Sequence, residues 1–121
     1  MRAVEIAEPG GPDVLRVVER DIPRLGSSDV LIRVSAAGVN RPDRLQREGK
    51  YPAPSGVTDI PGLEVSGTVV SAGSEVAFPR VGDAVMALVA GGGYAEFCAA
   101  PAGSCLRIPA GYSSIDAAAV P

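Results

Sequence analysis

The sequence contains no histidine, and this absence excludes more chemistry than any other feature of its composition. A Ser/His/Asp triad, a Cys/His dyad and an imidazole general base all need a histidine side chain. Every metal site with a histidine ligand is excluded as well. Any catalysis by this chain must therefore use other groups.

Only two cysteines, Cys98 and Cys105, are present. Two thiols cannot form a Cys₄ zinc site, and no histidine can complete a mixed one, so we expect no structural zinc. Their spacing is not that of a redox CxxC motif, and both lie in apolar stretches. We interpret them as small buried core side chains, with a disulfide between them as the alternative.

Aromatic residues make up only 4% of the chain, and its formal net charge is −3. The ten arginines and one lysine are scattered, so there is no basic, base-stacking surface and we expect no nucleic-acid partner. No apolar run approaches about 18 residues, the length that a membrane span needs. With no basic and apolar leader pattern either, we expect a soluble cytoplasmic protein without a membrane partner.

The chain has 121 residues, 46% of them hydrophobic, which is enough for a single domain with a sizeable core. We therefore assign residues 1–121 to one domain. Its 15 glycines and 11 prolines indicate many turns.

Alternation of apolar and polar residues predicts several short strands separated by glycine- and proline-rich turns. The clearest is 29–37, where Val30, Ile32 and Val34 share one face. Many short strands indicate a barrel or a sandwich. The other strands are expected over residues 2–7, 15–19, 64–71, 84–89, 94–99 and 104–108.

Two helices are predicted. Asn40 is a preferred N-cap, Pro42 is tolerated in the first turn and Asp43 complements the helix dipole, so a short helix should begin there and end at Gly49. A second helix begins after Ser113 with a pattern similar to a capping box. The sequence ends after barely one turn of it, so we expect the chain to be part of a longer protein.

Residues 51–62 hold three prolines and two glycines, and a loop of this length in a compact domain suggests function. The Gly91–Gly93 triplet does not complete a dinucleotide fingerprint, because Glu96 stands where the last glycine is needed. Asp43 and Glu64 flank such loops without an acid/base arrangement. We interpret them as a helix-cap partner and a hydrogen-bond anchor.

Five blocks of the sequence stand out in their order and spacing: AAGVNRPDRLQREGKYP, PGLEVSGTVVSAG, VGDAVMAL, GGGYAEF and LRIPAGYSSIDAAAVP. Together they resemble the zinc-independent, zeta-crystallin-like NADPH quinone oxidoreductases of the medium-chain dehydrogenase/reductase superfamily. The resemblance runs from Met1 to Pro121. It implies a mainly β fold, a GroES-like (chaperonin-10-like) partly open β-barrel with short helices, which is the N-terminal catalytic domain of longer enzymes whose Rossmann domain follows it.

The resemblance also implies a chemistry. Zinc alcohol dehydrogenases of the superfamily carry a cysteine where Asn40 stands and Gly-His-Glu where this chain has Gly62-Leu63-Glu64, and Glu64 alone cannot hold zinc. We therefore expect no metal and a hydride transfer from NADPH to a quinone. The intact enzyme should be a homodimer, and the 121 residues alone should be inactive.

Two site residues are carried over from the family. Tyr51 matches its Gly-x-Tyr motif, so its hydroxyl and ring should contact the cofactor or the quinone; the alternative is a tyrosine that only fills the core. Asn40, at the position of the lost zinc ligand, should offer amide donors to cofactor or substrate; alternatively it only caps the helix. The Gly91–Gly93 turn resembles the substrate-side loop of the family, with its backbone amides as the main binding groups, and a plain tight turn is the alternative.

Two other functions remain open at this stage. An enoyl reductase of the same superfamily shares the Asn-x-x-Asp helix start and the Gly-x-Glu-x-x-Gly strand. A stand-alone GroES-like barrel would act as a binding or assembly module without catalysis, although nothing in the chain resembles the partner motif of chaperonin-10.

Overall fold

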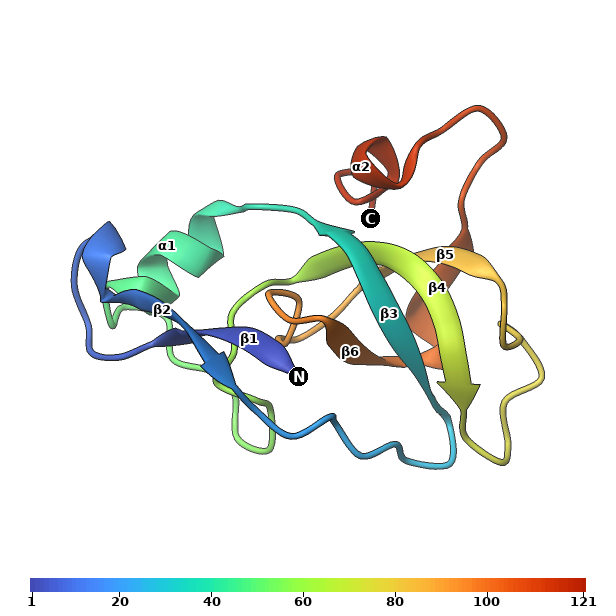
Figure 1. Cartoon of the computed structure of the whole chain (residues 1–121), viewed down its shortest axis with the longest axis horizontal. Helices are drawn as coiled ribbons and strands as arrows, with labels where there is room; N and C mark the ends of the chain where they lie inside the picture. The colour runs from blue at the N-terminus through green and yellow to red at the C-terminus, as the bar shows by residue number, and fades with distance from the viewer.

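A computed structural model describes all residues, 1–121, and holds seven strands, two short α-helices and two 3-10 turns. Five strands form one antiparallel sheet in the order β6-β3-β4-β5-β7, and β1 and β2 form a separate ribbon. Figure 1 shows this ribbon and α1 at the end of the molecule opposite to β5. The strands are β1 (Arg2–Ile6), β2 (Leu15–Glu19), β3 (Asp29–Ala37), β4 (Glu64–Ala72), β5 (Ala84–Leu88), β6 (Phe97–Pro101) and β7 (Cys105–Arg107).

Strand β3 organises the sheet, and it has the bounds and the buried face that its sequence predicts. Val30 and Ile32 are fully buried between neighbours on both sides, because β3 pairs with β4 and with β6. The register of β3 against β4 shifts twice, and such bulges increase the twist of a strand. The core inside the curved sheet consists of Val30, Ile32, Val65, Val69, Val85, Ala87, Val89, Cys98, Ala100 and Cys105.

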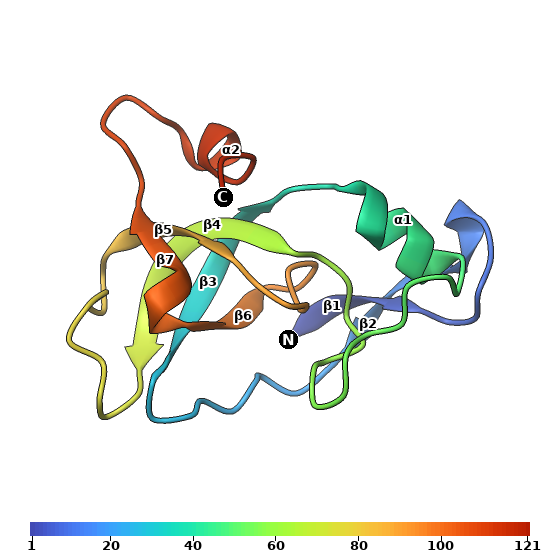
Figure 2. The ribbon, with the colours of Figure 1, turned by 180° about the vertical axis from the view of Figure 1, so that it is seen from behind.

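The predicted mainly β, partly open barrel is confirmed. The sheet curves around its core, but its edge strands β6 and β7 do not pair with each other; a 3-10 turn, η2 (Ala102–Ser104), joins them. Figure 2 shows this side, with β7 beside β5. The barrel is therefore open between its first and last strands.

Both helices begin where the sequence predicts. Helix α1 (Arg41–Arg47) has Asn40 as its N-cap. Helix α2 (Ser114–Ala117) is capped by the Ser113 hydroxyl, which accepts a hydrogen bond from Asp116 N over 3.1 Å. Helix α2 contacts β3 and β4 (Figure 1), and Ala117 in the helix and its C-cap Ala118 are buried.

The strand expected over 94–99 is displaced. Strand β6 begins at Phe97, while Tyr94 N donates to Pro61 O over 2.9 Å and Tyr94 O accepts from Val4 N over 2.8 Å. These bonds attach Tyr94 to β1 and to the preceding loop, and bonding to β3 starts only at Glu96, whose O accepts from Val34 N over 2.8 Å. Alternation in the sequence could not reveal this change of partner.

The two cysteines are free and buried in the core, which confirms the interpretation as small core side chains and not the alternative of a disulfide. Burial raises the pKa of the Cys98 thiol to about 12 and that of Cys105 to about 11. At neutral pH both remain protonated thiols and pack as small apolar side chains.

Candidate functional site

Asn40 lies between the end of β3 and the start of α1, and hydrogen bonds fix its backbone there. Its N–H donates to Asp43 Oδ2 over 3.0 Å, and the two residues form a capping box. Pro42 occupies the first turn, where a missing N–H leaves no bond unmade. The position of Asn40 as the N-cap of α1, predicted from the sequence, is confirmed. The N–H groups of its side-chain amide take no part in the cap and can make other contacts.

The amide of Asn40 is held by Glu64. Asn40 Nδ2 donates to Glu64 Oε1 over 2.8 Å, and Glu64 is only 7% exposed at the start of β4. A carboxylate only accepts hydrogen bonds, so this contact identifies which end of the amide faces Glu64. Gly38 leaves the space that this carboxylate fills, because a Cβ there would collide with Glu64 Oε1. The anchor role predicted for Glu64 is thus what the structure has.

Tyr94 completes this polar group, although no motif in the sequence selects it. Its hydroxyl donates to Asp43 Oδ2 over 2.6 Å across 51 residues of chain. Burial, together with the hydrogen bond to Asp43 and the charge of that residue, raises the pKa of Tyr94 far above its usual range, so the phenol stays protonated. Asp43 itself is only 6% exposed, and its other oxygen, Oδ1, is buried without a partner.

Close backbone packing brings Tyr94 to this place. Gly62 has a φ of +105°, and a Cβ on it would lie 2.7 Å from Tyr94 N and 2.8 Å from Gly93 Cα. Gly93 N donates to Gly62 O over 3.0 Å, and Gly92 N donates to Ile60 O over 2.8 Å. The amides of Gly92 and Gly93 are thus bonded within the chain, which favours the alternative of a plain tight turn at these two residues.

Tyr51 begins the loop that follows α1, and its side chain is 44% exposed. A tyrosine this exposed does not fill the core, so the purely structural alternative for Tyr51 loses its basis. Asn40 is the N-cap of α1, whereas Tyr51 lies four residues beyond its last residue, Arg47, and no hydrogen bond joins the two side chains. The structure therefore does not join the two predicted site residues directly.

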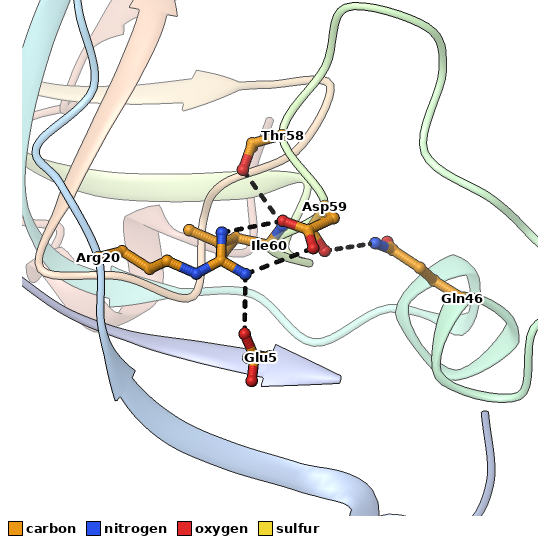
Figure 3. Close-up of polar contacts among 6 residues, drawn as sticks. All are labelled: Glu5, Arg20, Gln46, Thr58, Asp59 and Ile60. Carbon is orange, nitrogen blue, oxygen red and sulfur yellow. Dashed lines mark hydrogen bonds and ion pairs between the residues drawn. The ribbon is translucent and has the colours of Figure 1, made fainter. Parts of the chain in front are cut away.

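A polar network anchors the far end of the same loop (Figure 3). Arg20 Nη1 donates to Asp59 Oδ1 over 3.0 Å, and Arg20 Nη2 donates to Glu5 Oε1 over 3.0 Å. Gln46 of α1 donates to Asp59 O over 3.0 Å. The hydrogen bonds from Arg20 hold the pKa of Asp59 below its usual range. The loop that carries Tyr51 is thus attached both to the ribbon and to α1.

Two exposed apolar residues adjoin the Asn40–Glu64 pair. Val39, the chain neighbour of Asn40, is 83% exposed. Leu88, 56% exposed, is the cross-strand partner of Glu64, and directly paired residues share one face of a sheet. A largely apolar ligand with one polar group would suit such neighbours.

A pocket separate from these polar groups has a volume of about 890 Å³ and is lined by β6, by residues 88–92 and by the loop around Val57 and Thr58. Leu88 is on its wall, whereas Asn40, Glu64 and Tyr51 are not. Volume alone would select this pocket as a site. The hydrogen bonds that hold Asn40 instead select the surface around its amide as the candidate site.

Two of the three residues that stand at the zinc-ligand positions of the superfamily meet in space, because Asn40 and Glu64 are hydrogen-bonded. The third, Leu63, precedes Glu64 in the chain and is half-buried. No group of three or more His, Cys, Asp or Glu side chains is placed to hold a metal ion.

None of the helices is long and apolar enough to cross a membrane.

Comparison with known proteins identifies the relatives of this chain. The model of the alcohol dehydrogenase GroES-like domain family matches residues 26–110. The synaptic vesicle membrane protein VAT-1 homolog-like of Homo sapiens is 36% identical over 121 residues, which are 100% of this chain and 29% of that protein. The quinone oxidoreductase of Mus musculus is 39% identical over 103 residues, 83% of this chain and 31% of that protein.

Solved structures agree with these matches. The Escherichia coli quinone oxidoreductase complexed with NADPH superposes with a TM-score of 0.86 at 32% identity, over 99% of this chain and 37% of that one. The CurK enoyl reductase gives a TM-score of 0.83 at 26% identity, over 99% and 39%. The chain thus spans between a quarter and two fifths of the length of these four proteins.

Proposed function

Because the chain belongs to the alcohol dehydrogenase GroES-like domain family, in the quinone oxidoreductase branch, we propose that it forms the substrate-binding part of an NADPH-dependent quinone oxidoreductase. The complete enzyme would transfer a hydride from the nicotinamide to a quinone. The names of the relatives support an oxidoreductase; the quinone and the cofactor are our proposal.

One observation carries the proposal, the amide of Asn40 that Glu64 anchors beside exposed apolar residues. Glu64 takes one N–H of Asn40 Nδ2, and the amide oxygen faces Asp43 N in the capping box. One N–H remains for a ligand, which must then offer a hydrogen-bond acceptor. Val39 and Leu88 are exposed beside it. A flat apolar ring that carries a carbonyl oxygen, as a quinone does, has this combination of groups.

The same residues fit the nicotinamide end of NADPH. Its ring is flat and its carboxamide carries a carbonyl oxygen, so an amide N–H and an exposed tyrosine ring are suitable partners. Asn40 would orient such a carbonyl, and Tyr51 would pack on a ring and donate its hydroxyl to an oxygen. When bound, NADPH supplies the hydride, and the chain needs neither a metal nor an imidazole for that step. We accordingly propose a zinc-independent enzyme.

Parallel steady-state assays on the complete gene product test the proposal. We expect NADPH oxidation that depends on an added quinone, at a higher kcat/KM than with any enoyl thioester. The similarity to the CurK enoyl reductase favours the second candidate, reduction of an activated C=C bond. Turnover of enoyl thioesters with no turnover of quinones would replace the first candidate by the second.

We also propose a cytoplasmic homodimer, as the family resemblance implies. Sedimentation of the complete gene product should give the mass of two chains. A heptamer without NADPH oxidation would instead revive the third possibility, a GroES-like assembly module.

A further inference from the structure

The burial of Asp43 is not explained by its place in the capping box. A carboxylate can accept a bond from the N-cap N–H while it stays in water, as acidic residues in the first turn of a helix commonly do. Asp43 is instead 6% exposed, and its Oδ1 is buried without a partner. A buried acceptor without a hydrogen bond works against stability, and such departures are concentrated at functional positions.

Tyr94 covers this carboxylate and shares one of its oxygens with Asn40. Asp43 Oδ2 accepts from the Tyr94 hydroxyl over 2.6 Å and from Asn40 N over 3.0 Å. The side chain of Asn40 is fixed at its other end by Glu64, at 2.8 Å. A series of bonds therefore runs from the glycine-rich turn through α1 to the start of β4, and Asn40 lies at its centre.

We propose that Tyr94 and Asp43 are positioning residues that fix the amide of Asn40 for the carbonyl oxygen of the ligand. Tyr94 holds the carboxylate of Asp43, Asp43 holds the backbone of Asn40, and Glu64 sets the rotation of its amide. Neither Tyr94 nor Asp43 touches the ligand in this scheme. The inference rests on the proposed function, because it assigns these residues a role in binding the same carbonyl compound.

The test compares Tyr94→Phe with Tyr112→Phe in the complete gene product. Both changes remove one hydroxyl, but Tyr112 is 51% exposed in the turn before α2 and serves as the matched control. We expect Tyr94→Phe to lower kcat/KM for the quinone about three- to tenfold, the effect of one lost hydrogen bond. Tyr112→Phe should stay within about twofold of the wild type. An unchanged kcat/KM in an active Tyr94→Phe enzyme overturns the inference.

Two substitutions of Asp43 separate positioning from folding. Asp43→Asn keeps an oxygen that can accept from both Tyr94 and Asn40, so it should retain kcat/KM within about threefold. Asp43→Ala removes the acceptor and should lose about tenfold or more in the fraction that remains folded. A purely structural Asp43 would lower the melting temperature in Asp43→Ala and leave the kcat/KM per folded molecule unchanged.

A second readout does not depend on turnover. The two side-chain N–H protons of Asn40 should give well separated NMR signals, because only one of them is bonded to Glu64. In Tyr94→Phe we expect them to move toward the positions of a free amide, and in Tyr112→Phe to stay in place. Unmoved signals in Tyr94→Phe overturn the positioning role even if the protein is an active enzyme. If the protein reduces no quinone, the proposed function fails and this measurement still decides whether Tyr94 positions Asn40.

Discussion

Replacing Gly62 by alanine tests the packing that brings Tyr94 to the candidate site. The φ of +105° at Gly62 is strained for any other residue, which costs about 1–3 kcal/mol. The new Cβ would lie 2.7 Å from Tyr94 N and 2.8 Å from Gly93 Cα. Both are backbone atoms, which cannot relieve the collision by a change of rotamer as a side chain could. Separating the two segments weakens the bonds Gly93 N–Gly62 O and Tyr94 N–Pro61 O, at about 1 kcal/mol each. We expect Gly62→Ala to lose about 3–5 kcal/mol of unfolding free energy.

Gly82→Ala is the matched control for this substitution. Gly82 has a similar φ of +95°, but a Cβ on it meets no atom within 4 Å. Urea unfolding of both variants, at equal m-values, separates the backbone strain from the collision. Gly62→Ala should have an unfolding free energy about 2 kcal/mol lower than that of Gly82→Ala, because only Gly62→Ala weakens two backbone hydrogen bonds. Its tyrosine absorbance titration should also show the pKa of Tyr94 moving down toward that of an ordinary tyrosine. Equal stabilities would refute the packing argument.

Three further predictions concern the loop, the ion pair and the metal. In the complete gene product, Tyr51→Phe should lose about 0.5–1.5 kcal/mol of transition-state binding and Tyr51→Ala more; unchanged kcat/KM in a stably folded Tyr51→Ala would remove Tyr51 from the site. The pKa of Asp59 is lowered in the folded state, so its ion pair with Arg20 stabilises the protein above the unfolded pKa and is lost as the pH falls through the folded one. Since the Asp59 side chain is 72% exposed, Asp59→Asn should cost at most about 1 kcal/mol at neutral pH and nothing in strong acid, measured by urea unfolding at both pH values. Elemental analysis of the purified protein after dialysis against a chelator should find no zinc; one zinc per chain would contradict the branch assignment.

The sequence predicted the parts of the fold that depend on local pattern. Strand β3 and the starts of both helices follow from alternation and capping residues, which act over a few positions. The displaced start of β6 could not be predicted, because Tyr94 exchanges backbone bonds with Val4 and Pro61, residues far away in the chain.

The residues of the candidate site also differ in whether the sequence alone could identify them. Asn40 could be selected from its place at a helix start and from the family resemblance, and Asp43 and Glu64 from their positions beside the loops. Tyr94 could not, since its bond to Asp43 spans 51 residues and its position depends on two glycines that pack backbone against backbone. The pairing of Asn40 with Glu64 likewise becomes visible only when β3 and β4 lie side by side.

Quinone-dependent NADPH oxidation by the complete gene product, measured for the wild type, Asn40→Ser and Asn40→Ala, tests the central claim most directly. Serine is as good an N-cap as asparagine but has no amide, so Asn40→Ser keeps the cap and removes the amide N–H groups from which Glu64 and the ligand would accept. The account predicts activity in the wild type and a loss of about tenfold in both variants, with Asn40→Ala also less stable by about 1 kcal/mol. A wild type that oxidises no NADPH with any quinone, or an Asn40→Ser variant as active as the wild type, would contradict it.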